Sequence, residues 1–208
     1  MATVIRPPAP ARTRRPAAET RNQILDAAED LFYRHGITAT GVDRIAAAAG
    51  VAPTTLYRLF RSKDELVAAY VDRYAAGYRD WIESLTSDPR CPARDRILAM
   101  FDALVTVTGA EAFRGCPFLM VLAEYPDPTS AAHASAQAVK AWVRGRLHEL
   151  ARELPDRDTA AAEAISDRLA LVIEGLYAST AALGTQGPAR RARELAVLVM
   201  DATTGSPS

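Results

Sequence analysis

The feature that most constrains the fold is a pair of short helical segments joined by a tight turn, within residues 40–60, "TGVDRIAAAAGVAPTTLYRLF". Gly50 suits the left-handed conformation of such a turn. Pro53 suits the first position of a helix, because the N–H that it lacks would be unpaired there. Ala46 lets the two helices approach closely, and Leu56 fills the angle between them. Two helices joined by a turn of about three residues predict a helix-turn-helix.

The rest of the chain has helical periodicity and no strand-like alternation. Helix one is expected within residues 19–35, and Gly36 ends it. Thr40 is expected to cap the second helix and Ser62 the fourth, which runs to about Leu85. Later helices are expected at residues 93–108, 117–125, 131–154, 159–184 and 189–203, separated by Pro- and Gly-containing segments. The predicted fold is therefore all-α, with about nine helices.

Composition and charge divide the chain into three parts. Residues 1–17 are rich in Pro, Ala and Arg and lack an apolar period, so we expect a disordered basic tail. Residues 18–64 are expected to form the helix-turn-helix domain and residues 65–208 a helical domain. The first 65 residues carry ten Lys and Arg against seven acids, whereas the remainder carries fifteen against eighteen. A basic N-terminal part and an acidic remainder suggest two separate functions.

Several protein classes are excluded by what the sequence lacks. No apolar run approaches the roughly 20 residues that span a bilayer, so we expect a cytoplasmic protein with no membrane partner. Cys91 and Cys116 have neither the number nor the spacing of a disulfide framework or metal site. The three histidines lie in separate segments, and no phosphate-binding glycine loop is present. We therefore predict a protein that is not an enzyme and has no cofactor.

The third helix of the motif, residues 53–60, has a polar outer face. At 100° per residue, turning its leucines and Phe60 inward leaves Thr54, Tyr57 and Arg58 outward, with Thr55 on the flank. Hydroxyls, an aromatic ring and a guanidinium suit a DNA major groove, which presents phosphates, acceptor edges and thymine methyl groups.

Residues 20–71 resemble the N-terminal DNA-binding domain of the TetR family of transcriptional regulators. The turn and third helix, "GVAPTTLYRLF", and the following "SKDEL" match the family pattern, apart from Ala52, Thr54 and Leu59. The resemblance implies that Tyr57 and Lys63 contact phosphates. The predicted DNA-binding set is Thr40, Arg44, Thr54, Thr55, Tyr57, Arg58 and Lys63.

The resemblance also implies an all-helical C-terminal region that binds a small molecule. In the fourth helix, aromatic residues recur at spacings of three and four, which indicates either a packed core or the wall of a ligand cavity. Glu124 lies in an apolar helix, where its carboxylate needs a partner, either an arginine or a polar ligand. The predicted ligand-binding set is Tyr70, Tyr74, Tyr78, Trp81, Phe101, Phe118, Glu124 and Trp142.

The resemblance further implies dimerisation through the last two long helices. The predicted interface consists of Val172, Leu176, Thr180, Leu195, Leu198 and Val199, with packing inside one subunit as the alternative. The predicted function is a homodimeric DNA-binding regulator, a repressor that leaves a palindromic double-stranded operator when a small hydrophobic effector binds. The alternatives are a thiol-responsive regulator that uses Cys116 without an organic ligand, and a regulator whose pocket is filled by its own side chains.

Overall fold

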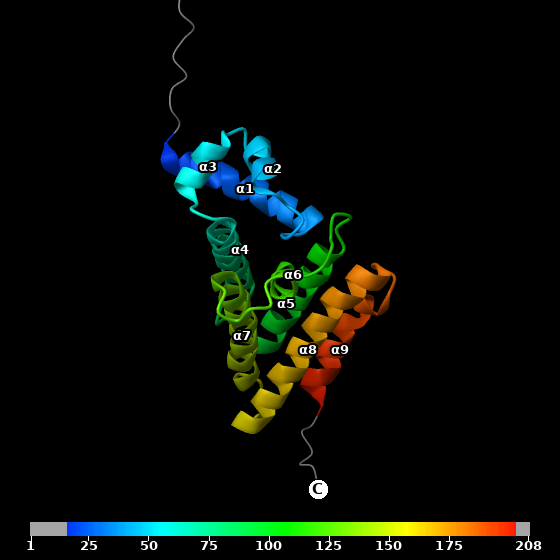
Figure 1. Ribbon diagram of the computed structural model, residues 1–208. Helices are drawn as coiled ribbons and strands as arrows, with labels where there is room; N and C mark the ends of the chain where they lie inside the picture. The colour runs from blue at the N-terminus through cyan, green and yellow to red at the C-terminus, as the bar shows by residue number, and fades with distance from the viewer. Residues whose placement is uncertain (1–15, 203–208) are drawn as a thin grey trace, which may run out of the picture.

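A small three-helix unit sits at one end of a larger helical body in the computed structural model, which describes residues 16–202 (Figure 1). The α-helices are α1 (Ala17–His35), α2 (Val42–Ala48), α3 (Pro53–Leu59), α4 (Lys63–Thr86), α5 (Ala93–Thr108), α6 (Pro117–Glu124), α7 (Ala131–Arg152), α8 (Thr159–Leu183) and α9 (Ala192–Asp201). A short 3₁₀ helix, η1 (Pro188–Arg191), precedes α9. The described residues contain no strand, so the all-α prediction is confirmed. Most of the predicted basic tail lies outside the described residues, and its last residue, Ala17, opens α1.

The corner between α2 and α3 is closed by backbone hydrogen bonds around Gly50. Gly50 has φ +65°, and its N–H donates to the Ala47 carbonyl at 3.1 Å. The Val51 N–H donates to the Ala46 carbonyl at 3.0 Å. This pair of bonds ends α2 in a Schellman motif and turns the chain into α3. Leu56 and Phe60, both buried, then pack α3 against α1 and α2.

Two of the three predicted helix starts are confirmed. Pro53 is the first residue of α3, and the Ser62 hydroxyl accepts a hydrogen bond from the Glu65 N–H at 3.1 Å. Thr40 as the cap of α2 is wrong, because the cap residue is Gly41 and no side chain caps it. The Thr40 hydroxyl is buried instead and donates to the Gly36 carbonyl at 2.7 Å.

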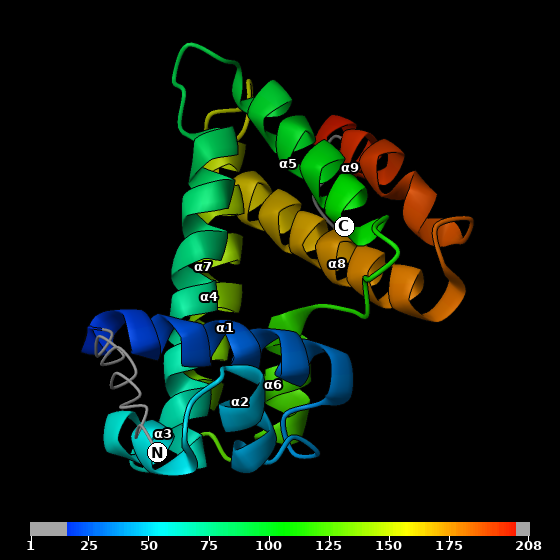
Figure 2. The same cartoon turned by 90° about the horizontal axis from the view of Figure 1, so that it is seen from above.

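The body is built around the long helix α4. α7 runs alongside α4, and α8 packs against α7 and α9, while α5 contacts α4, α7, α8 and α9 (Figure 2). α6 lies beneath the three-helix unit and packs on α7. None of the described helices has both the length and the apolar character needed to cross a bilayer. Tyr33 of α1 is hydrogen-bonded to the loop before α6, and Asp64 near the start of α4 accepts a hydrogen bond from Tyr125, which directly follows α6.

Candidate DNA-binding surface and ligand pocket

The outer face of α3 presents the polar side chains that the sequence predicts. Tyr57 is 49% exposed although it is a large aromatic residue. Thr54 and Arg58 are exposed beside it, and Thr55 is half-buried. None of the four predicted residues of α3 is buried in the core, so this face of the helix is accessible to a DNA groove.

Three residues of the predicted DNA-binding set lie outside α3. Arg44 is exposed on α2. Lys63, at the start of α4, is half-buried, and its Nζ donates to the Thr38 carbonyl at 3.2 Å. Thr40, the third of them, is fully buried, and its hydroxyl donates to the Gly36 carbonyl, so this side chain does not reach the surface that α3 presents.

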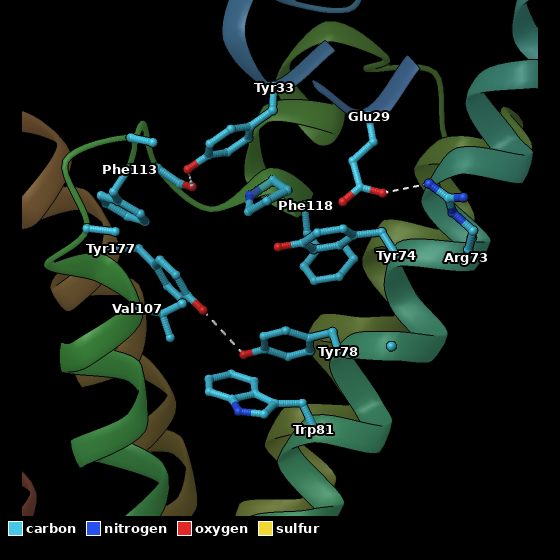
Figure 3. A pocket seen from close by; sticks show the side chains of 15 residues that line it. Glu29, Tyr33, Arg73, Tyr74, Tyr78, Trp81, Val107, Phe113, Phe118 and Tyr177 are labelled. Carbon is cyan, nitrogen blue, oxygen red and sulfur yellow. Dashed lines mark hydrogen bonds and ion pairs between the residues drawn. The ribbon is translucent and has the colours of Figure 1, made fainter. Parts of the chain in front are cut away.

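A cavity of about 660 Å³ lies where the three-helix unit meets the body (Figure 3). Its walls come from α1, α4, the segment from α5 to α6, and α8. The lining residues are Glu29, Tyr33, Arg73, Tyr74, Gly77, Tyr78, Trp81, Val107, Ala110, Ala112, Phe113, Gly115, Pro117, Phe118 and Tyr177. The volume falls within the range of small-molecule sites in proteins.

Aromatic rings define the inner wall of this pocket. The ring of Phe118 lies between those of Tyr74 and Tyr78, with both centroid separations at 5.4 Å and edge-on geometry. Tyr78 also contacts Trp81 at 5.7 Å, and on the opposite wall Phe113 stacks on Tyr177 at 6.1 Å. Such ring faces favour a flat, mainly apolar ligand.

Two phenols face each other across the pocket. The hydroxyl oxygens of Tyr78 and Tyr177 are 3.4 Å apart and form a hydrogen bond (Figure 3). Burial raises the pKa of both phenols well above the ordinary value of 10.0, so both are neutral at physiological pH. Because one of the two donates to the other, the second O–H can donate to a polar group of a ligand.

An ion-pair cluster lines the side of the pocket between α1 and α4. Arg73 of α4 donates to Glu29 of α1 at 2.8 Å (Figure 3). It also donates to Asp26 of α1 at 2.6 Å. The pocket thus reaches the DNA-binding domain itself, because Glu29 and Tyr33 belong to α1. Sequence reasoning missed these two residues, since α1 was assigned wholly to the helix-turn-helix core.

Half of the predicted ligand-binding set lines the pocket. Tyr74, Tyr78, Trp81 and Phe118 do so. The other four lie outside this pocket. Phe101 is fully buried in the core, and Tyr70 is 3% exposed and lines a neighbouring hollow between α1 and α4. Trp142 lies in a groove between α4 and α7, and the Glu124 carboxylate accepts hydrogen bonds from the α1–α2 loop. Helical spacing placed Tyr70 and Tyr74 on one face, but it did not show where the packing of α1 closes the cavity. Tyr177 was also missed, because the apolar sequence around it is typical of a buried helix.

Neither cysteine is paired in the structure. Cys116 is 4% exposed and precedes α6 behind the pocket wall, and Cys91 is half-buried. Within residues 16–202 there is no group of His, Cys, Asp or Glu side chains that could hold a metal ion.

The α8–α9 face includes exposed apolar residues from the predicted dimer interface. Leu195 and Leu198 are 45% and 59% exposed, and Leu171, which the sequence did not single out, is 71% exposed. Val172 and Val199 are half-buried. Leu176 and Thr180 are almost fully buried within the single subunit, and Leu176 lines a hollow on this face together with Leu171, Val172 and Leu195.

Comparison with known proteins agrees with this geometry. Residues 24–70 match the model of the bacterial regulatory proteins of the tetR family. A TetR-family transcriptional regulator from Streptomyces coelicolor has a similar structure, with a TM-score of 0.81 and 31% identity over 88% of this chain and 95% of that one. A putative TetR-type transcriptional regulator from Streptomyces avermitilis has a TM-score of 0.72 and 29% identity, over 86% and 97% of the two chains.

Curated relatives match over part of the chain. The transcriptional activator FasR of Mycolicibacterium smegmatis is 40% identical over 93 residues, which are 43% of this chain and 42% of FasR. The regulator TtgR of Pseudomonas putida is 37% identical over 98 residues, 45% of this chain and 47% of TtgR. The matched region thus spans less than half the length of either relative. The chain belongs to the TetR family and is a DNA-binding transcriptional regulator of the helix-turn-helix type.

Proposed function

We propose that the protein is a homodimeric repressor that leaves a palindromic operator when a small, mainly apolar effector occupies the aromatic pocket. The observation that carries the proposal is the position of this pocket, whose wall includes Tyr33 of the DNA-binding domain as well as Trp81 of the body. A ligand there contacts both parts of the protein at once. It can therefore favour one arrangement of them over another, which is the requirement for ligand control of DNA binding.

The effector that this pocket favours is a flat aromatic molecule with one polar group. Most of the wall is apolar or aromatic, so the bulk of the ligand is held by ring contacts. The neutral phenols of Tyr78 and Tyr177 supply the hydrogen-bonding point. Glu29 and Arg73 form an ion pair at the side of the pocket, so neither charge is left to attract a highly charged ligand.

The DNA-binding surface and the α8–α9 face support the proposed pairing of two subunits. One α3 has seven residues and reaches few base edges, so two copies on neighbouring major grooves give a specific site. The exposed leucines Leu171, Leu195 and Leu198 form the apolar face through which α8 and α9 pair with their symmetry mates.

The proposal is tested by selecting binding sites from a random DNA library and measuring affinity for the selected duplex by fluorescence anisotropy. We expect a palindromic site, and a weakening of at least about tenfold when a pocket-binding aromatic compound is saturating. Nile red, a neutral planar dye, is a suitable first compound, and quenching of Trp81 fluorescence in a Trp142→Phe background reports its binding. Compounds that occupy the pocket without changing operator affinity would contradict the proposal.

The thiol-responsive alternative predicts a different result. Cys116→Ser would then abolish a response of operator binding to peroxide. The Cys116 thiol is almost completely buried, which does not favour this alternative, because reactive thiols are usually accessible.

A further inference from the structure

A second hollow lies beside the aromatic pocket, between α1 and α4. It has a volume of about 370 Å³, and its lining residues are Asp26, Glu29, Asp30, Tyr33, Tyr70 and Tyr74. The four residues of α1 occupy positions i, i+3, i+4 and i+7, so they share one side of that helix. The two tyrosines of α4 are one helical turn apart and form the opposite wall. We call this site the acidic hollow.

The acidic hollow has one carboxylate more than the arginines beside it can neutralise. Arg73 is shared by two carboxylates, since it donates to Asp26 at 2.6 Å and to Glu29 at 2.8 Å. Asp30 pairs with Arg34 at 2.6 Å, and both of these side chains are exposed. Three carboxylates and two guanidinium groups leave a net charge of −1, and none of the residues that line the hollow is basic. Such a wall attracts a single positive charge.

The hydroxyl of Tyr70 is an unused polar group in this hollow. Tyr70 is only 3% exposed, and within residues 16–202 its hydroxyl takes part in no hydrogen bond. Burial raises the pKa of Tyr70, and the nearby Tyr74 phenol and Glu29 carboxylate raise this pKa further, so the hydroxyl is neutral and lies close to these two groups. A buried hydroxyl without a partner is costly, and a ligand that donates a hydrogen bond to its oxygen removes this cost.

Aromatic rings make the hollow suitable for an organic cation. The ring centroids of Tyr70 and Tyr74 are 6.2 Å apart, and Tyr33 adds a third ring from α1. The faces of such rings attract ammonium groups. A metal ion instead needs several converging oxygen ligands. Within the described part of the chain, no group of acidic, His or Cys side chains could hold a metal ion, so the observations favour an organic ammonium.

The acidic hollow and the aromatic pocket are continuous. Glu29, Tyr33 and Tyr74 line both of them. Figure 3 shows Glu29 and Tyr33 extending from α1 toward the Tyr74 ring, with Arg73 beyond Glu29. A molecule whose rings lie in the aromatic pocket can therefore place a short arm in the acidic hollow.

We propose that the acidic hollow binds the ammonium group of an organic cation whose aromatic part occupies the adjoining pocket. This assignment rests on the proposed effector function and adds a cationic arm to the effector. The ammonium N–H groups donate to the Glu29 carboxylate and to the Tyr70 oxygen, and the rings of Tyr70 and Tyr74 cover its remaining sides.

Two dansyl compounds of the same shape test the charge preference. Dansylcadaverine has a flat ring system, a sulfonamide and a five-carbon arm that ends in an ammonium group, and N-hexyl dansylamide has a methyl group in the place of the ammonium. Titration followed by dansyl fluorescence gives both Kd values. A hydrogen bond to a charged group changes Kd by roughly 10- to 100-fold, and we expect about tenfold tighter binding of the ammonium compound because the hollow is open to solvent. Equal Kd values, or tighter binding of the hexyl compound, overturn the proposal.

Variants of the hollow locate the preference. Tyr70→Phe and Glu29→Gln should each raise the Kd of dansylcadaverine toward that of the hexyl compound and change the latter by less than about twofold. Asp80→Asn, which removes an exposed carboxylate of α4 that lines neither cavity, is the matched control and should keep the wild-type ratio of the two Kd values. A wild-type ratio in both hollow variants overturns the proposal.

A competition experiment separates organic cations from metal ions. Magnesium chloride should displace dansylcadaverine no better than sodium chloride of equal ionic strength. Specific displacement by magnesium would overturn the assignment to an organic ammonium.

Failure of the proposed effector function gives a different pattern from failure of the hollow. If dansylcadaverine binds with the expected preference but leaves operator affinity unchanged, the effector function fails and the acidic hollow stands. If neither dansyl compound binds, the proposed aromatic effector fails, and pentylammonium chloride then tests the hollow alone. Changes in the NMR shifts of the Asp30 and Tyr70 amides on its addition support the hollow, whereas unchanged shifts overturn it.

Discussion

Removal of one exposed leucine from the α8–α9 face should weaken self-association by a calculable amount. Leu198 is 59% exposed in the single chain. Full burial of a leucine contributes roughly 1.5–3 kcal/mol, so covering the exposed part contributes about 0.9–1.8 kcal/mol. A twofold interface uses the residue twice, so Leu198→Ala costs about 2–3.5 kcal/mol. This corresponds to a rise of roughly 30- to 300-fold in the dimer Kd, nearer the lower figure because alanine keeps one methyl group.

Sedimentation velocity over a wide range of concentrations measures this Kd, with the subunit mass of 22.4 kDa as the lower limit. Leu119→Ala is the control, because Leu119 is a 39% exposed leucine on α6, outside this face. We expect the control to dimerise as the wild type does. A Leu198→Ala protein with the wild-type dimer Kd would refute the assignment of this face, and a wild type that stays monomeric would refute dimerisation as proposed.

Four further predictions concern single residues. Lys63→Gln should weaken binding to all duplexes alike and reduce the salt dependence of the operator affinity by about one in slope, whereas Arg58→Ala should reduce the binding free energy by about 1–3 kcal/mol and relax the sequence preference. Fluorescence anisotropy over a salt series distinguishes the two effects. A sequence-selective effect of Lys63→Gln would argue against a phosphate contact. Gly50→Ala should lower the free energy of unfolding, measured by urea titration, by about 1–2 kcal/mol. The reason is the backbone conformation, since φ +65° disfavours a side chain although the added Cβ has room. An unchanged midpoint of the urea transition would show that the turn adopts another conformation in the variant. Since the folded pKa of Glu124 is below 4.5, its stabilisation should be complete above that pH and be lost as the pH falls through the folded value. Amide exchange of Ile37 should accelerate over that acidic range, after correction for intrinsic rates, and the acceleration should be absent in Glu124→Gln.

Helix positions were largely predictable because local signals determine them. The expected helix at residues 93–108 coincides with α5, and those at 117–125 and 159–184 differ from α6 and α8 by one residue at the C-terminal end. Proline at the first position and glycine after the last are local devices, and they need no knowledge of the partner helix. The last expected helix, residues 189–203, is divided into η1 and α9, a change of pitch that periodicity does not reveal.

The pocket was only half predictable because its remaining wall comes from a segment distant in sequence. Tyr78 and Trp81 stand out by their spacing on one helix. Tyr33, in contrast, lies in a helix whose apolar residues build the DNA-binding core, and nothing local indicates that its ring turns toward the body. For Glu124 the sequence indicated a need for a partner, and the structure supplies two backbone amides where an arginine had been one expectation.

The contribution of α1 to the pocket limits how this regulator can be recombined with others. Engineers often exchange the DNA-reading part of a regulator to redirect it to a new promoter while keeping its sensor. Here such an exchange also replaces Glu29 and Tyr33, and with them part of the sensor wall. A chimera that retains these two side chains together with Gly36 should keep its ligand range, whereas one joined cleanly at the start of α4 should acquire a different one.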